Sequence, residues 1–300
     1  MSHTVTVPGT TANIGVGFDC LGAALTIYNE FQFAPLDSDE VEITVEGTEA
    51  SKVRTDETNL LYRSFIKLYE KIDITPPGVK IHTKLGVPLS RGLGSSATAI
   101  VGGLMGANAL AGKPLSKQEI CELAIKTEGH PDNVVPALYG NCQLSVGEPG
   151  NWQITELPWN KDIVPVVAIP DFELSTAEAR SVLPHSYSRA DAVFNISRMG
   201  LLIRGLAANN SKWLETALND KIHQPYRQEL IEGYSEVKQA AIEAGAYGMV
   251  ISGAGPTLLA LCDRLSVEGV VLAMQEAWKD RGVSPVVKAL KLDEVGAVVG

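Results

Sequence analysis

Alternation of apolar and polar residues predicts β-strands in both halves of the chain. It marks residues 4–7, 41–45, 79–84, 140–146 and 286–292. A continuous apolar run predicts a buried strand at 164–169, and 248–252 with 257–261 predict a hairpin. We expect Pro8 and Gly9 to end the first strand, because proline cannot donate a sheet hydrogen bond.

Apolar residues at helical spacing predict the helices. The expected spans are 59–72, 97–111, 117–126, 188–207, 211–218, 226–244 and 267–281. Ser116 and Glu119 form a capping box before one of them, and Asn59 suits the cap position of another. Glu128 and His130 are expected in an irregular loop just past a helix end.

The order of these elements predicts an α+β fold with two domains. A turn-rich break at residues 147–151 leads us to divide the chain into domains at 1–153 and 154–300. The second half runs strand, helices, hairpin, helix, strand, which is typical of a ferredoxin-like α+β unit. A chain of 300 residues is long enough for two domains of ordinary size.

A glycine-rich segment before the helix at 97–111 predicts a phosphate-binding loop. Gly92 and Gly94 permit positive φ and a close approach to the main chain, and Ser95 and Ser96 can cap the helix. A helix N-terminus offers free N–H groups and the positive end of the helix dipole, which suit an anion. We assign to this loop Pro88, Leu89, Ser90, Arg91, Gly92, Leu93, Gly94, Ser95, Ser96, Ala97 and Thr98.

Two further interpretations of this loop remain open at this point. The Walker pattern is absent, because no Gly-Lys-Ser/Thr follows four residues after a glycine. The looser dinucleotide pattern Gly-x-Gly-x-x-Ala is present, but Gly86 and Pro88 interrupt the approaching strand, and Glu119, the acid at the right distance, falls where a helix begins. An ordinary tight turn before a helix also fits the segment.

Composition argues against several kinds of binding partner and indicates where the protein is located. The formal net charge of −10 argues against a nucleic-acid or anionic-membrane surface. The four cysteines are far apart and form no Cys-x-x-Cys pair, which argues against a structural zinc site. Residues 1–13 lack the features of a signal peptide, so we expect a cytoplasmic protein.

The loop closely resembles the second motif of the GHMP kinases, the superfamily that includes galactokinase and mevalonate kinase. Residues 8–19 look like the first motif in the form found in members that act on homoserine, and 252–257 look like the third. Two further segments, 128–133 and 175–180, are also similar to those members. The resemblance spans nearly the whole chain and implies an N-terminal ATP-binding domain followed by a C-terminal ferredoxin-like domain.

The resemblance implies a role for each matching residue. ATP would lie on the loop, with Asn59 bordering the adenine, and Mg²⁺ would be held by Glu128 and Ser96, since Mg²⁺ on a nucleotide needs few protein oxygens. Asn133 would orient the reacting hydroxyl, while a general base stays open, although Asp132 matches an aspartate taken as base in mevalonate kinase. The implied substrate-binding residues are Asn13, Asp19, His130, Asn133, Thr176, Arg180, Arg227 and Gly253.

Within that set, Asp19 would pair with the substrate's ammonium, and Arg180 with Arg227 would clamp its carboxylate. Simpler explanations stand beside these roles: a helix cap for Asn59, a solvated loop acid for Glu128, and surface ion pairs for the arginines. For Asn13, Asp19 and His130 the simpler explanations are turn hydrogen bonds and an exposed loop position.

The implied activity is ATP-dependent phosphorylation of the side-chain hydroxyl of L-homoserine, a step of threonine biosynthesis, by an expected homodimer. One alternative is a GHMP kinase acting on mevalonate or a sugar. Those substrates lack an α-ammonium and would leave Asp19 without a partner. The sequence is also compatible with a catalytically silent binding protein of this fold and with a Rossmann oxidoreductase.

Overall fold

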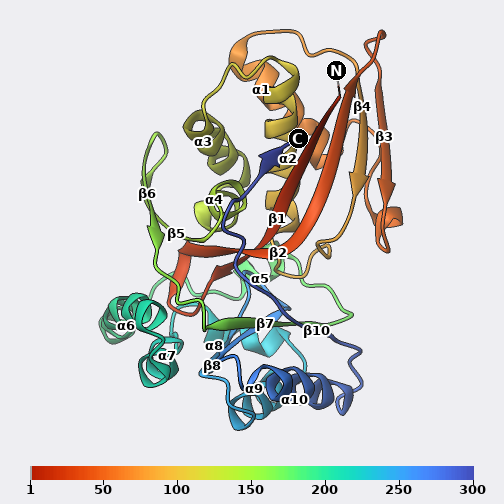
Figure 1. Cartoon of the computed structure of the whole chain (residues 1–300). Helices are drawn as coiled ribbons and strands as arrows, with labels where there is room; N and C mark the ends of the chain where they lie inside the picture. Colours follow the sequence, from red (N-terminus) through yellow and green to blue (C-terminus); the bar gives the residue numbers. More distant parts are fainter. Residues whose placement is uncertain (1) are drawn as a thin grey trace.

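The computed structural model describes residues 2–300 and contains two β-sheets (Figure 1). The seven-stranded sheet comprises β1 His3–Asn13, β2 Gly17–Pro35, β3 Val41–Glu46, β4 Val79–Lys84, β5 Cys142–Glu148, β6 Asn151–Leu157 and β11 Val298–Val299. The four-stranded sheet comprises β7 Val164–Ile169, β8 Gly248–Ile251, β9 Leu258–Cys262 and β10 Val286–Ala289. The chain is therefore an α+β protein with two domains.

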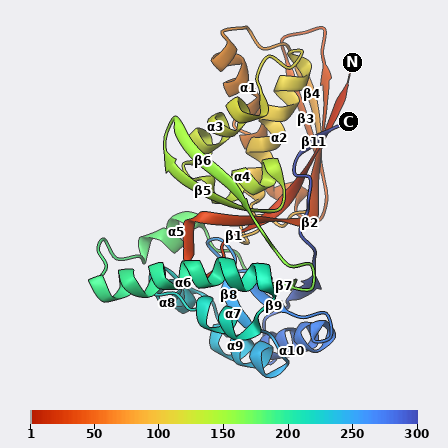
Figure 2. The same cartoon turned by 60° about the vertical axis from the view of Figure 1, so that its left-hand side comes forward.

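The helices cover these sheets in two groups. In the first domain they are α1 Leu60–Ile72, α2 Ser95–Leu110, α3 Lys117–Glu128 and α4 Pro131–Tyr139, with the 3₁₀ turn η1 Ala50–Lys52. In the second they are α5 Thr176–Ser181, α6 Arg189–Ala208, α7 Ser211–Ala217, α8 Gln224–Arg227, α9 Tyr234–Glu243 and α10 Val267–Lys279, with η2 Gln228–Leu230. Helices α1–α4 lie on one face of the larger sheet (Figure 2). No helix among residues 2–300 is long and apolar enough to cross a bilayer.

The two sheets are connected through a shared core. Leu21 and Leu25 of β2 and Leu93 of the phosphate loop pack in one cluster with Val167 of β7 and Leu259 of β9. Each Å² of apolar surface that is buried contributes roughly 25 cal/mol, so this cluster stabilises the contact between the two sheets. The phosphate loop is thus held between the domains, where residues of both can reach a common ligand.

The C-terminal segment also joins the domains. After β10, the chain returns to the first domain, where β11 pairs with β1 in an antiparallel register that places Val299 opposite Val5. The returning C-terminal segment is a feature that the pattern of residues did not predict.

Strand β3 pairs with β4 in parallel, and such a pair needs a crossover, which α1 supplies.

Most predicted strands are confirmed, and several predictions are corrected. Strand β1 continues through Pro8 and Gly9 to Asn13, because a register shift against β2 at this point accommodates the proline. Asn13 and Asp19 follow the expected end of the first strand, but Asn13 is the last residue of β1 and Asp19 belongs to β2. Both residues have positive φ, 69° and 57°. Asparagine and aspartate tolerate this conformation better than most residues.

The predicted domain boundary and some helix ends are also corrected. The boundary at 153/154 falls inside β6, which pairs with β5 in the larger sheet, so the chain changes sheet between Leu157 and Val164. Helix α2 is capped by Gly94 in the left-handed conformation, and no serine side chain caps it. The helix expected at 226–244 is interrupted at Gly233, which also has a positive φ.

Candidate active site

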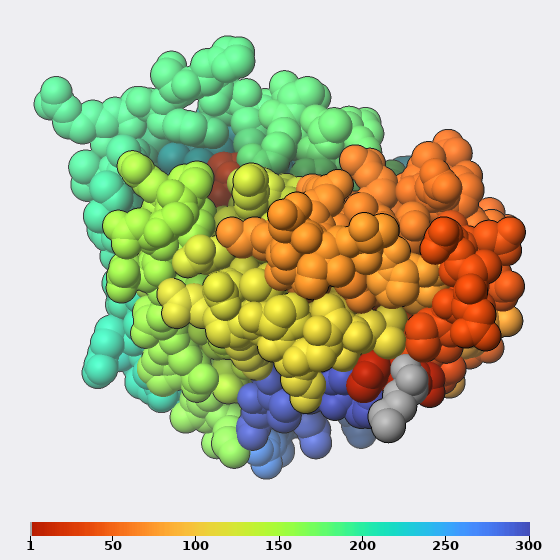
Figure 3. Space-filling view, turned by 90° about the horizontal axis from the view of Figure 1, so that it is seen from above, coloured from red at the N-terminus to blue at the C-terminus, as the bar shows by residue number. Residues whose placement is uncertain are grey.

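A cavity of about 210 Å³ lies where the two domains meet. In the space-filling view the surface is hollowed between the green segment of α5 and α6 and the yellow-green helices of the first domain (Figure 3). Its lining comes from the hairpin of β1 and β2, the phosphate loop, the α3–α4 junction, α5, α8 and the β8–β9 loop. The five sequence motifs that carry the resemblance therefore converge on one site.

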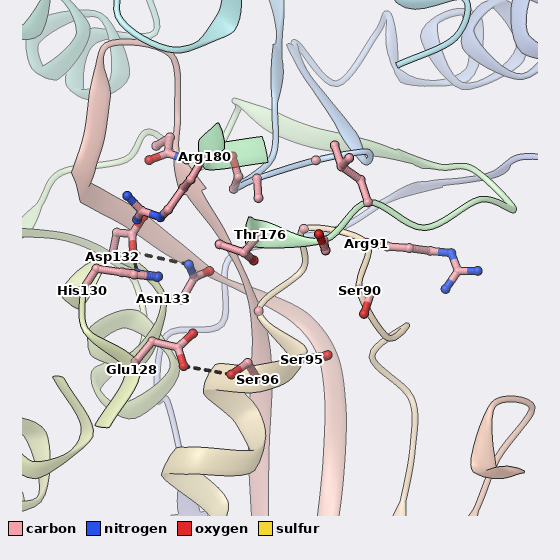
Figure 4. A pocket seen from close by; sticks show the side chains of 18 of the residues that line it. Ser90, Arg91, Ser95, Ser96, Glu128, His130, Asp132, Asn133, Thr176 and Arg180 are labelled. Carbon is pink, nitrogen blue, oxygen red and sulfur yellow. Dashed lines mark hydrogen bonds and ion pairs between the residues drawn. The ribbon is translucent and has the colours of Figure 1, made fainter. Parts of the chain in front are cut away.

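One wall, which we call the phosphate wall, consists of Gly92, Gly94, Ser95, Ser96 and Glu128. The N-terminus of α2 faces the cavity (Figure 4). Within residues 2–300, no carbonyl accepts a hydrogen bond from the backbone N–H of Ser95, Ser96 or Ala97, whereas Thr98 N donates to Gly94 O. These N–H groups and the positive end of the helix dipole make this wall suited to an anion.

The two loop glycines allow the loop to pack against its own chain. A Cβ atom on Gly92 would come within 2.2 Å of Ser252 O, and one on Gly94 within 2.0 Å of Thr10 Oγ1. Both residues also have positive φ, 73° and 68°. We expected their close approach to be toward a ligand; the structure shows that it is toward β1 and the β8–β9 loop.

The predicted loop residues divide into two groups. Ser90, Arg91, Gly92, Gly94, Ser95 and Ser96 line the cavity, whereas Pro88, Leu89, Leu93, Ala97 and Thr98 do not. Leu93 and Ala97 are fully buried in the apolar cores. The Thr98 hydroxyl donates to Ser95 O and accepts from Asn29, so it supports the loop from behind.

Arg91 borders the cavity, but its guanidinium points away from it (Figure 4). It donates to Glu49 Oε1 at 2.8 Å and to the carbonyl oxygens of Leu89, Pro170 and Asp171. The Glu49 carboxylate also accepts from Leu89 N at 2.8 Å. Arg91 therefore ties the phosphate loop to the segment before α5.

Glu128 and Ser96 meet at the phosphate wall. Glu128 is the last residue of α3, not part of an irregular loop, and its Oε2 accepts from Ser96 Oγ at 2.8 Å. Burial raises the pKa of Glu128, against the hydrogen bond from Ser96 and the nearby His130. Two adjacent oxygen ligands fit Mg²⁺ that keeps the rest of its coordination from phosphates and water. Residues 2–300 contain no larger cluster of His, Cys, Asp and Glu that would form a metal cage.

The start of α4 brings three polar side chains to the cavity. His130 occupies the N-cap position of α4, and its side chain makes no capping hydrogen bond. Its Nδ1 lies 2.5 Å from Asp132 Oδ1. Burial opposes the charged form of His130, but the hydrogen bond and charge of Asp132 outweigh it and raise the pKa. Asn133 Oδ1 accepts from Thr10 Oγ1 at 2.8 Å, and its Nδ2 lies 3.4 Å from Asp132 Oδ1.

Asp132 is a cavity residue that the sequence did not lead us to assign to the site. It lines the cavity and is only 2% exposed. Its position between His130 and Asn133 was the available signal, together with the match to the base of mevalonate kinase. Leu174, Ser175, Ala254 and Gly255 also line the cavity without having been predicted.

The opposite wall, which we call the clamp wall, consists of Asp19, Arg180 and Arg227. Arg180 donates from Nη1 and Nη2 to the two carboxylate oxygens of Asp19 at 3.0 and 2.7 Å. We predicted that each would pair with a different end of a substrate; the structure pairs them with each other. Asn13 accepts from Asp19 N at 2.9 Å and donates to Gly253 O at 2.7 Å, so it holds this wall together.

Arg227 is the deepest charge of the clamp wall. It is 1% exposed and donates from Nε to Ala179 O at 3.0 Å and from Nη1 to Gly253 O at 3.2 Å. Within the described chain, no carboxylate oxygen lies within 4.0 Å of it. Burial, and secondly the charge of Arg180, lower the pKa of Arg227 to about 10. Arg227 is therefore a buried cation without an anionic partner, and a surface ion pair is the wrong explanation for it.

Thr176 and Gly253 line the cavity as predicted, but Asn59 does not. Asn59 is the N-cap of α1: its Oδ1 accepts from Leu61 N and Tyr62 N at 2.9 and 3.2 Å, and its Nδ2 donates to Arg54 O. Both polar atoms of the amide therefore bond within the fold. The structure thus supports the cap and places Asn59 outside the cavity.

Comparisons with known proteins show the family to which the chain belongs. Residues 59–141 match the family model "GHMP kinases N terminal domain" and residues 202–280 match "GHMP kinases C terminal". A homoserine kinase from Trichormus variabilis is 63% identical, covering 99% of this chain and 98% of its own length, and one from Crocosphaera subtropica is 63% identical over 99% and 97%. The crystal structure of a homoserine kinase from Cytophaga hutchinsonii has a TM-score of 0.91 at 30% identity and covers 100% of this chain and 97% of that one.

Proposed function

The chain belongs to the homoserine kinases of the GHMP kinase family, and we propose that its cavity holds L-homoserine on the clamp wall beside ATP on the phosphate wall. The protein is an enzyme that phosphorylates the side-chain hydroxyl of L-homoserine with ATP. The product is O-phospho-L-homoserine, and we place the step in threonine biosynthesis. The observation that carries the placement of the substrate is the unpaired buried cation Arg227, since a substrate carboxylate would compensate its charge.

The nucleotide is expected to use main-chain groups. The N–H groups of Ser95, Ser96 and Ala97 and the N-terminus of the 16-residue helix α2 would receive its phosphate oxygens. Glu128 and Ser96 would hold Mg²⁺, which when bound neutralises phosphate charge. Because phosphoryl transfer passes through a loose transition state, positioning and charge neutralisation supply most of the catalysis.

The zwitterionic substrate is expected to use side chains. Its carboxylate would accept from Arg227 and Arg180, and its ammonium would pair with Asp19. Binding would then exchange the ion pair between Asp19 and Arg180 for two pairs with the ligand, so no charge of the clamp wall is left unpaired. A substrate with a carboxylate but no ammonium would gain no contact from Asp19, which disfavours mevalonate.

Asn133 is the group that we propose to orient the reacting hydroxyl. Thr10 fixes its Oδ1, and the Asp132 carboxylate, which can only accept, faces its Nδ2. The amide is therefore held in one orientation at the junction of the two walls. No side chain is assigned as general base. We also propose that the enzyme works as a homodimer in the cytoplasm, as its resemblance to the family implies.

The experiment that tests the function is an ADP-release assay with ATP, Mg²⁺ and each of homoserine, mevalonate, galactose and serine. We expect turnover of homoserine alone at substrate concentrations near its KM. Equal turnover of mevalonate or galactose would contradict the proposed clamp, and absence of ADP release with every acceptor would support the silent binding protein. The Rossmann oxidoreductase is already ruled out, because β1, β2 and β4 form antiparallel pairs and not a parallel sheet.

A further inference from the structure

A buried histidine lies directly behind the clamp wall. His223 precedes α8 and is 0% exposed. Its Nε2 lies 2.8 Å from Gly15 O, and its Nδ1 lies 3.4 Å from Arg227 Nη1. A carbonyl oxygen can only accept and a guanidinium can only donate, so Nε2 carries the proton and the lone pair of Nδ1 faces Arg227. Burial lowers the pKa of His223, which favours this neutral form.

His223 is itself held rigidly. The carboxylate of Asp220 accepts from His223 N and Gln224 N, both at 2.8 Å, and from Asn195 Nδ2 at 2.6 Å. The imidazole ring stacks on Phe18, with ring centroids 5.2 Å apart and an angle of 23° between the planes. The position of the ring is thus set by its backbone and by one face, independently of any ligand.

Phe18 connects this histidine to both arginines of the clamp wall. The guanidinium carbons of Arg227 and Arg180 lie 5.1 and 5.7 Å from the centroid of its ring. An aromatic face attracts a cation, so the ring favours two like charges lying close to each other. Phe18 immediately precedes Asp19, and it therefore supports the clamp wall from the same hairpin.

We propose that His223 is a positioning residue, which together with Phe18 keeps the guanidinium of Arg227 oriented for the substrate carboxylate. The neighbours that orient Arg227 are Ala179 O, Gly253 O and His223 Nδ1, and all three are uncharged acceptors. A carboxylate in the place of the imidazole would hold the guanidinium equally well but would also neutralise it. A neutral histidine fixes the direction of the guanidinium and leaves its charge for the ligand. This inference rests on the proposed function of Arg227.

Two substitutions separate the contacts of the two ring nitrogens. His223→Asn keeps an amide near the position of Nδ1, where its oxygen can accept from Arg227, whereas His223→Gln keeps an amide near Nε2 and loses that acceptor. We expect His223→Gln to raise the KM for homoserine about tenfold and His223→Asn less than about threefold, with the KM for ATP unchanged in both. His82→Asn, in β4 and outside the cavity, serves as the control.

Phe18→Leu tests the contact of the Phe18 ring with the two arginines. Phe18 is half-buried, so a smaller side chain there leaves no large cavity in the core. We expect it to raise the KM for homoserine about threefold without changing the KM for ATP. Circular dichroism and thermal unfolding identify any variant that fails to fold. The proposal is overturned if folded His223→Gln and Phe18→Leu keep the wild-type KM for homoserine, or if they raise the KM for homoserine and the KM for ATP equally.

Arg227→Lys tests the proposed function of Arg227 separately from the positioning role of His223. If it raises the KM for homoserine while His223→Gln and Phe18→Leu do not, Arg227 keeps its proposed function and the positioning by His223 is wrong. If Arg227→Lys leaves that KM unchanged, the proposed clamp is wrong, and the positioning role is wrong with it.

Discussion

Arg91 and Arg227 both border the cavity and are both buried, 8% and 1% exposed, yet their surroundings are opposite. Arg91 belongs to the phosphate loop and pairs with the carboxylate of Glu49 and with three carbonyl oxygens. Arg227 belongs to α8, touches only uncharged acceptors and has no carboxylate partner in the described chain. The first charge is compensated inside the fold, and the second is not.

This difference extends to other residues for which the sequence predicted a role in the site. Asn59 resembles Arg91, because all its polar atoms bond within the fold. Glu128 resembles Arg227, because its only hydrogen-bond partner in the described chain is Ser96, which belongs to the same wall. A polar side chain beside a cavity can therefore be structural or functional, and its remaining bonding capacity decides between the two. We expect the functional residues to affect kinetics and the structural ones to affect stability.

Glu128→Gln should produce the largest effect. Loss of one preorganised charged group in phosphoryl transfer lowers kcat by roughly 100- to 1000-fold, whereas the KM for homoserine should stay within about twofold. The measurement is steady-state kinetics at several Mg²⁺ concentrations. The free energy of unfolding should not fall, because burial raises the pKa of Glu128 and its charged form is therefore disfavoured in the fold. A near-normal kcat would remove Glu128 from the metal site.

Methionine at the two arginine positions gives a matched comparison. Arg227→Met should lower kcat/KM for homoserine roughly 100-fold, because the substrate carboxylate loses its charged partner. Arg91→Met should instead lower the free energy of unfolding by about 3 kcal/mol, since it removes the donor to the carbonyl oxygens of Leu89, Pro170 and Asp171. It should change both KM values by less than about twofold. Kinetics and urea unfolding of both variants check this. If Arg227→Met lowered only the free energy of unfolding and Arg91→Met lowered only kcat/KM, the distinction between the two arginines would be wrong.

Asn59→Ala should have a smaller effect, on stability alone. Loss of a helix cap costs about 1 kcal/mol, and the KM for ATP should not change. Asn59→Asp is the control, because its carboxylate still accepts from Leu61 N and Tyr62 N but cannot donate to Arg54 O. An increased KM for ATP at unchanged stability would instead support the predicted adenine contact.

The smallest effect concerns pH. Asp132 raises the pKa of His130 above 6.5, so their ion pair stabilises the fold fully below that pH. This contribution is lost as the pH rises through the raised pKa of His130. Asp132→Asn should lower that pKa, as measured by NMR titration of the His130 ring. It should also reduce the difference in unfolding free energy between about pH 6 and about pH 9. An unchanged His130 titration would contradict the assigned partner.

Several elements could not be predicted from the sequence, for identifiable reasons. Strand β2 carries polar residues and glycines that interrupt its alternation, and it is maintained by pairing with β1, β4 and β5 along its length. Helix α4 contains Pro136, which predicts against a helix, but it packs against β1, β2 and β5. The break at 147–151 is a hairpin turn between β5 and β6 rather than a domain boundary.

The sequence alone determined the local features of this protein. Glycines followed by the start of a helix predict an anion-binding loop, because the direction of main-chain N–H groups depends on the conformation of a few consecutive residues. Only the tertiary structure decided which charged side chains face the cavity. Whether an arginine is compensated depends on partners such as Glu49 beside Arg91 or Ala179 O beside Arg227, which the fold brings from distant parts of the chain.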